Sequence, residues 1–186
     1  MDSLSERKRE IEEYYRRMIV KLVREAGTAI RKEMVKRHAL TAEVNLRYAE
    51  SLRKLIEEDY RLLSKPFEDV FKGGIERASK GEDIEKVFEE SFFTLLTMGE
   101  GFKLTYPLVV MIDHINSVNS FLRSVINKIV EELSKEGIYL HPIEPVSLPS
   151  SPDVASLANG LREALYRMDM AIGILKGLID ASKGDC

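Results

Sequence analysis

Residues 112–133 read IDHINSVNSFLRSVINKIVEEL, and this stretch decides the fold. Its apolar side chains recur at alternating steps of three and four residues, the a/d pattern of helices that pack along a seam. With its flanks, the pattern predicts one long helix over 107–136, ended by Gly137 as the C′ residue. The seam, available for packing or for an oligomer interface, consists of Ile112, Ile115, Asn119, Leu122, Ile126, Ile129 and Leu133.

Asn119 is the polar member of this seam. A buried Asn at an a position fixes helix register and oligomeric state at a cost in stability. In that case, replacing Asn119 by Ile would raise thermal stability and loosen oligomeric specificity. The alternative is that Asn119 lies at the edge of a helical core or bonds to another buried polar group. Asn116 and Asn127 are expected on other faces of the helix.

The last helix is expected to start at Ser151 and Pro152 and to present a wide apolar face. Glycines in a helix interior each cost about 1 kcal/mol of helix propensity. Their presence near this face therefore indicates a close approach by another helix. The glycines are Gly160, Gly173 and Gly177, and the a, d and e positions are Val154, Leu157, Ala158, Leu161, Ala164, Leu165, Met168, Ala171, Ile172, Leu175, Leu178 and Ile179.

The first 65 residues contain no Pro and a single Gly, Gly27. Apolar intervals of three and four residues predict helix throughout. Lys36, Arg37 and His38 suit a helix C-terminus and Thr41 suits a new N-cap, so we expect a break near 38–41. The two helices would then form an antiparallel hairpin over 3–64 whose apolar stripes cover each other.

Between these long helices, two shorter helices and a strap are expected. Pro66 suits the first turn of a third helix that ends at Gly81. Asp83 is expected to cap a fourth helix, which reaches about Met98. Residues 138–152 hold four of the six prolines yet carry several apolar side chains. They are therefore predicted to be an extended strap packed along the bundle before the last helix.

These patterns together predict an all-α bundle of about six helices in a single domain, 1–186. Within it, residues 1–65 carry 16 Lys and Arg against 12 Asp and Glu, whereas residues 66–186 carry 12 against 19. The hairpin 3–64 is thus basic and the remainder, 66–186, is acidic. The total of −3 argues against a dedicated nucleic-acid binder.

Composition also indicates the environment. The charged opening residues lack an apolar signal region, and no apolar run reaches the roughly 20 residues of a membrane span, so we expect a cytoplasmic protein. The one cysteine, Cys186, allows no disulfide within the chain. The absence of Gln, with abundant Glu, Lys and Arg, favours a thermophilic source.

Four cations of the first helix, Arg16, Arg17, Lys21 and Arg24, have the spacing to track the phosphates of a nucleic acid. Interleaved glutamates three and four residues away favour a self-neutralised helix surface instead. Nucleic-acid binding or RNA processing by the basic helices is therefore kept as an alternative function.

Catalytic signals are sparse. The spacing of Arg31 and His38 resembles the Arg-x6-His motif of the small helical HEPN ribonucleases, although Lys32 follows the arginine where the motif usually has a polar residue. That resemblance implies the two residues as candidates for RNA cleavage across a dimer interface. The three histidines are too dispersed to define a metal site, so neither a metal nor another cofactor is expected.

The function that the sequence favours is therefore non-catalytic: a helical interaction or scaffold protein that self-associates, as a homodimer, through apolar helix faces, with a protein partner as a further option. A second alternative is a bundle that binds a small apolar ligand. Its expected lining is Phe88, Phe92, Phe102 and Tyr106.

Overall fold

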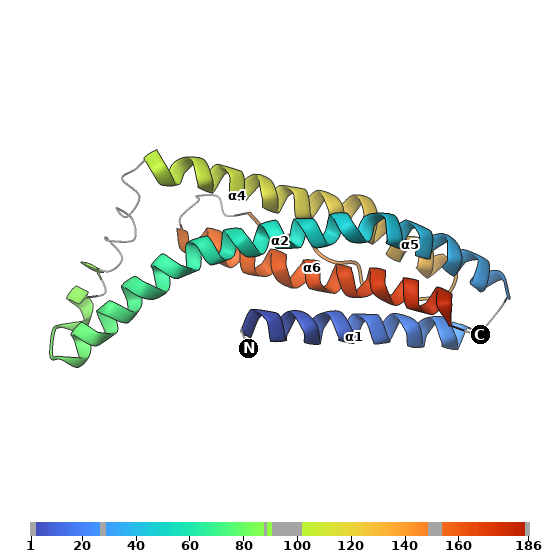
Figure 1. The fold of residues 1–186 in the computed structure, drawn as a ribbon, viewed down its shortest axis with the longest axis horizontal. Coiled ribbons are helices and arrows are strands. Elements are labelled where there is room, and N and C mark those ends of the chain that lie inside the picture. Colours follow the sequence, from blue (N-terminus) through green and yellow to red (C-terminus); the bar gives the residue numbers. More distant parts are fainter. Residues whose placement is uncertain (1–2, 27–28, 88, 91–101, 149–153, 185–186) are drawn as a thin grey trace.

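The computed structural model describes residues 3–26, 29–87, 89–90, 102–148 and 154–184, and it confirms the all-α class (Figure 1). Within these ranges there is no β-strand. The labelled elements are α1 (Ser3–Ala26), α2 (Ala29–Ser79), α4 (Phe102–Phe121), the π-helical turn η1 (Leu122–Ile126), α5 (Asn127–Lys135) and α6 (Val154–Lys183).

Helix α6 is the centre of the bundle. It packs against α1, α2 and α4, which surround it in Figure 1. A helix that is covered on several sides must be apolar around much of its circumference. This explains why its predicted a, d and e positions are almost all buried, among them Leu161, Met168 and Leu175 at 0% exposure.

Helix α1 lies against α6 at backbone distance. A Cβ built on Gly173 would be 2.6 Å from the carbonyl oxygen of Glu12, and one built on Gly177 would be 2.6 Å from Cβ of Ile19. Such distances leave no room for a side chain, so the predicted close helix contact is confirmed at these two glycines. At Gly160 the nearest atom is a side-chain methyl of Ile115 at 3.4 Å, an ordinary contact.

Ion pairs flank this contact. Lys176 Nζ donates to a carboxylate oxygen of Glu12 and lies 3.7 Å from a carboxylate oxygen of Glu50. Arg16 binds Asp180 with two nitrogens, Nη2 donating to Oδ1 at 3.0 Å. Because charge pairing requires specific partners, these contacts fix the register of α1 along α6, and Lys176 also ties both helices to α2.

Helix α2 runs unbroken through 38–41, so the predicted break there is wrong. The hydroxyl of Thr41 donates to the carbonyl of Arg37 at 3.3 Å, a bond within the helix rather than a cap. Val35, Ala39 and Ala42 are buried and continue the core-facing stripe at helical spacing. The burial of these side chains outweighs the local capping preference of Thr41. Helices α1 and α2 each pack along α6 rather than covering each other.

The predicted third helix is also part of α2, which passes through Pro66 and ends at Ser79. Pro66 removes one backbone donor from the helix interior. The last turns of α2 extend beyond the bundle (Figure 1). Gly81, at φ 96°, ends the helix as predicted. Its N–H donates to the carbonyl oxygen of Ala78, and the N–H of Glu82 donates to the carbonyl oxygen of Arg77.

Part of the predicted fourth helix is described. Residues 84–87 and 89–90 are helical, and the carboxylate of Asp83 accepts from the N–H of Glu85 at 3.1 Å, as a capping residue does. Its expected continuation to Met98 lies outside the described residues.

The long helix predicted over 107–136 is confirmed, with one interruption, but it begins earlier than predicted, at Phe102, so Pro107 lies inside it. The N–H of Asn127 bonds to the carbonyl of Leu122, five residues earlier, which makes η1 a π-turn between α4 and α5. Beyond α5, Gly137 has φ 83°, and the N–H of Ile138 bonds back to the carbonyl of Leu133. The seam faces the chain's own core: Ile115, Leu122, Ile126, Ile129 and Leu133 are buried and Ile112 packs against them.

Residues 138–148 form neither helix nor strand, and two asparagines hold their backbone. The amide of Asn119 donates to the carbonyl of Val146 at 2.9 Å and accepts from its N–H at 2.7 Å. Asn127 makes the same pair of bonds with Ile143, at 2.9 and 2.8 Å. Arg167 of α6 adds a bond to the carbonyl of Glu144 at 2.7 Å. Of the predicted strap, residues 149–152 lie outside the described range.

The π-turn explains why both asparagines reach this segment. Residues eight apart are about 80° apart around a regular α-helix. One extra residue in the turn reduces the effective spacing to seven, which leaves about 20°. The expectation that Asn127 lies on another face is therefore wrong.

Asn119 bonds within the chain, so its replacement by Ile removes two hydrogen bonds. We therefore expect this replacement to lower stability, contrary to the gain that an oligomer-register role implies.

The close contact of α1 with α6 makes a prediction about its glycines. Gly177→Ala is expected to lower the free energy of unfolding by about 1–3 kcal/mol, because the new methyl overlaps Ile19 and the backbone of Arg16. Gly73→Ala is the matched control in α2: nothing lies within 4 Å, so it is expected to stabilise by about 0.5–1 kcal/mol through helix propensity. Urea unfolding measures both, and equal effects would contradict the contact.

Candidate functional site

Helix α2 carries an apolar stripe on the face that the core does not use. Five large apolar side chains are solvent-exposed there: Leu40 at 64%, Val44 at 79%, Tyr48 at 52%, Leu55 at 41% and Leu62 at 61%. At about 100° per residue they fall within roughly 80° of the helix circumference, over about 33 Å of its length. We call these five residues the α2 stripe.

The α2 stripe adjoins α4 along one edge. The ring of Tyr48 lies 5.4 Å, centroid to centroid, from the ring of Phe121 in α4. Farther along, Asp59 of α2 and Nδ1 of His114 of α4 are 2.5 Å apart and partly buried. These two contacts hold α4 beside the stripe without covering it.

The other flank of the stripe is charged. Glu43 and Arg61 lie on this flank at about the same angle around the helix, with Arg47 and Lys54 between them. Arg61 binds Glu57 within the helix, Nη2 to Oε1 at 2.8 Å. An apolar stripe with a charged border is the arrangement that helices use at partner interfaces.

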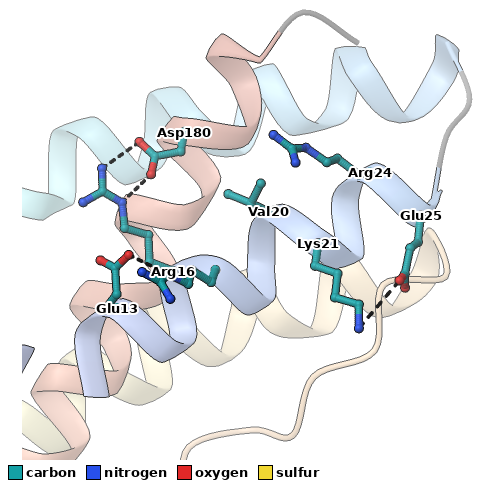
Figure 2. Close-up of a pocket in the computed structure, with 8 residues that line it drawn as sticks. Glu13, Arg16, Val20, Lys21, Arg24, Glu25 and Asp180 are labelled. Atoms are coloured by element: carbon teal, nitrogen blue, oxygen red, sulfur yellow. Dashed lines mark hydrogen bonds and ion pairs between the residues drawn. The ribbon is translucent and has the colours of Figure 1, made fainter. Parts of the chain in front are cut away.

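A groove lined by four cations and three carboxylates is the second feature of the surface. It lies beside α1, has a volume of about 480 Å³, and all four predicted nucleic-acid-binding cations line it. Figure 2 shows Asp180 of α6 beside it. The lining residues are Glu13, Arg16, Arg17, Val20, Lys21, Arg24, Glu25 and Asp180, which we call the α1 groove.

Three of the four cations already have carboxylate partners. Arg16 binds Asp180, and Arg17 Nε donates to Glu13 at 2.8 Å. Lys21 Nζ is 3.9 Å from Glu25, and both side chains are well exposed. Among the described residues, no ion pair is found for Arg24. In Figure 2 its side chain extends on the side of Asp180, whereas Lys21 and Glu25 point the other way.

Of the pair implied by the HEPN resemblance, the structure describes only the side chain of His38. His38 is buried, at 5% exposure, and its Nε2 has no hydrogen-bond partner among the described residues. The nearest counter-charge, a carboxylate oxygen of Glu132 in α5, is 3.7 Å away. Arg31 belongs to α2, but its side chain lies outside the described residues. His38 is therefore a buried side chain in this structure.

Three further expectations concern ligands and membranes. Phe88, Phe92 and the side chains of Phe102 and Tyr106, proposed to line an apolar pocket, lie outside the described residues. In the described part of the chain, no three His, Cys, Asp or Glu side chains gather closely enough to hold a metal ion. None of the described helices combines the length and the apolarity needed to cross a bilayer.

Two features of these surfaces were missed by the sequence analysis. The α2 stripe is visible in the sequence as a second apolar series at helical spacing, offset from the core series that contains Ala49, Leu52 and Ile56. The contribution of Asp180 to the α1 groove has no local signal, because it lies 164 residues from Arg16.

Comparison with protein-family models, curated proteins and solved structures returns no match to this chain.

The burial of His38 predicts a dependence of stability on pH. Burial lowers the pKa of His38 below its ordinary 6.5; Arg37 lowers it further, whereas Glu132 and Glu136 oppose the change. Between the lowered pKa and 6.5, the unfolded chain binds more protons than the folded one. The contribution of His38 is therefore complete above pH 6.5 and is lost as the pH falls below it.

His38→Leu is expected to reduce the loss of unfolding free energy between pH 7.5 and pH 5.5, measured by urea unfolding at each pH. His141→Leu, at an exposed position, is the matched control and should leave the loss unchanged. An unchanged pH dependence in His38→Leu would show that other groups govern acid stability.

Proposed function

We propose that this chain is a non-catalytic helical interaction protein that self-associates through the α2 stripe as an antiparallel homodimer. The observation that carries the proposal is the stripe itself: five large apolar side chains, each at least 41% exposed, on one face of a 51-residue helix. Exposed apolar surface of this extent and order is typical of protein–protein contact sites.

The spacing of the stripe favours a second copy as its occupant. In a twofold symmetric interface, residues equidistant from the axis meet each other. Leu40 and Leu62 are each eleven residues from Ser51, and Tyr48 and Leu55 are three and four residues from it. An antiparallel pair of α2 helices that cross at Ser51 would therefore place Leu40 against Leu62 at both ends, with the small Ser51 at the centre.

Charge on the flank is mixed in this register: Arg47 of each copy would lie one residue from direct opposition to Lys54 of the other, a like-charge contact, whereas Glu43 and Arg61 form opposite-charge contacts. Antiparallel helices bring the same flank of both copies together. Glu43 and Arg61 lie eight residues before and ten residues after Ser51, so each Glu43 would approach Arg61 of the other copy within one helical turn. Both exchanges occur in a symmetric pair, which gives two opposite-charge contacts at the rim. Such contacts contribute more to orientation than to affinity.

Val44→Glu tests the proposal at the most exposed member of the stripe. In the antiparallel register, Val44 lies opposite Glu58, so the introduced carboxylate meets a like charge twice. We expect the mass by light scattering to fall from roughly twice the 21.2 kDa of one chain to the monomer value. The position is 79% exposed, so the fold should be retained.

Ile75→Glu is the matched control. Ile75 is in the same helix and 68% exposed, but it is more than about 100° from the stripe. It should leave the mass unchanged. A monomeric parent protein at all concentrations, or equal dissociation by both variants, would contradict self-association through the α2 stripe.

A further inference from the structure

The backbone of residues 138–148 is held in an extended form by two asparagines. Asn119 binds Val146, and Asn127, farther along the helix, binds Ile143, so the segment runs antiparallel to that helix. The two asparagines are eight residues apart, about 10–12 Å along a helix, whereas the residues they bind are only three apart. The segment therefore rises by roughly 3–4 Å per residue, close to the reach of an extended chain.

Burial along this segment has a period of three residues. Ile143 and Val146 are buried, and Leu140, three residues earlier, packs against the core, whereas the residues between them are exposed. An extended strand alternates with a period of two, but a polyproline II helix has three residues per turn. Pro142 and Pro145 favour the same helix, because each fixes its own φ near −65° and restricts the residue before it to extended conformations.

One of the three faces of this polyproline II helix is an exposed apolar ridge. Both prolines are exposed, the side chain at 139 is 76% exposed and that at 148 is 38% exposed. Successive members of the ridge are about 9 Å apart at 3.1 Å per residue. The buried face is formed by other residues, so the prolines stiffen the segment without being used in its packing. The proline ridge consists of Tyr139, Pro142, Pro145 and Leu148.

We propose that the proline ridge binds a partner domain whose aromatic side chains form slots for a polyproline II helix. Such domains recognise two prolines in the spacing P-x-x-P, which Pro142 and Pro145 have. Among the described residues, no hydrogen bond is found to the carbonyls of these two prolines, so they are available to donors in the groove of the partner.

The backbone contacts of the segment argue against a partner that adds a β-strand. Strand addition requires a row of free backbone N–H and C=O groups. Here the N–H and C=O of both Ile143 and Val146 are bound by asparagine side chains. The same bonds hold the ridge in one conformation before binding. A partner therefore does not have to order it, which reduces the entropic cost of association.

Fluorescence titration of purified SH3 and WW domains with the full chain tests the proposal. The chain contains no Trp, so any change in tryptophan emission comes from the domain and reports on its aromatic groove. We expect a saturable change with at least one of these domains, reversed by a free peptide that contains P-x-x-P and fills the same groove.

Variants of the ridge locate the contact. Pro142→Ala and Pro145→Ala are each expected to weaken binding about tenfold, the effect of losing a buried anchor of an interface. Ser147→Ala is the matched control, because Ser147 is exposed in the same segment but outside the ridge, and it should change affinity less than about twofold. Thermal unfolding followed by circular dichroism verifies that all three variants are as stable as the parent.

Three outcomes would overturn the proposal. The first is no saturable change with any of the domains up to a millimolar concentration of the chain. The second is an affinity of Pro142→Ala and Pro145→Ala equal to that of the parent. The third is binding that Val44→Glu abolishes and the proline variants do not, which assigns the contact to the α2 stripe.

Discussion

The packing of α1 against α6 at backbone distance is the constraint on which the rest of the structure depends. Gly173 and Gly177 leave no room for a side chain between the two helices. This approach places Glu12 beside Lys176 and Arg16 beside Asp180, which fixes the register of α1. With α1 on one side and α2 and α4 on others, α6 is covered, and the outer faces of α1 and α2 are left to carry the α1 groove and the α2 stripe.

Periodicity and glycine chemistry made much of this fold predictable. The apolar faces of the last two long helices follow directly from spacing, because burial on one side of a helix requires that period. Gly81 and Gly137 were expected at helix ends, and both adopt a positive φ. Gly173 and Gly177 were expected at a close contact because only a packing requirement offsets their cost in a helix. The sequence also singled out the four cations of α1 that line the α1 groove, but not Asp180, whose carboxylate lines it as well.

Three predictions were wrong: the helix break near 38–41, the helix start at Pro66 and the helix face of Asn127. In each case tertiary contacts outweigh a local preference. Thr41 resembles an N-cap, yet Val35, Ala39 and Ala42 continue the buried stripe of α2 across it. The burial of these three side chains outweighs the capping preference of Thr41, so the helix continues. Pro66 suits the first turn of a helix by local preference, yet it lies inside α2. The π-turn at 122–126 cannot be predicted from the spacing of apolar residues. It aligns Asn119 and Asn127 with the backbone of residues 143–146, a segment distant in sequence that both asparagines bind.

Self-association through the α2 stripe is tested most directly at the proposed twofold axis. Helix axes about 8–10 Å apart, with Cα atoms about 2.3 Å from each axis, leave roughly 4–5 Å between facing Cα atoms, which a disulfide spans. In a Cys186→Ser background, Ser51→Cys is predicted to form a covalent dimer under mild oxidation, whereas Tyr139→Cys, exposed and away from the stripe, stays monomeric. No cross-link at Ser51, or equal cross-linking at both positions, would contradict the account.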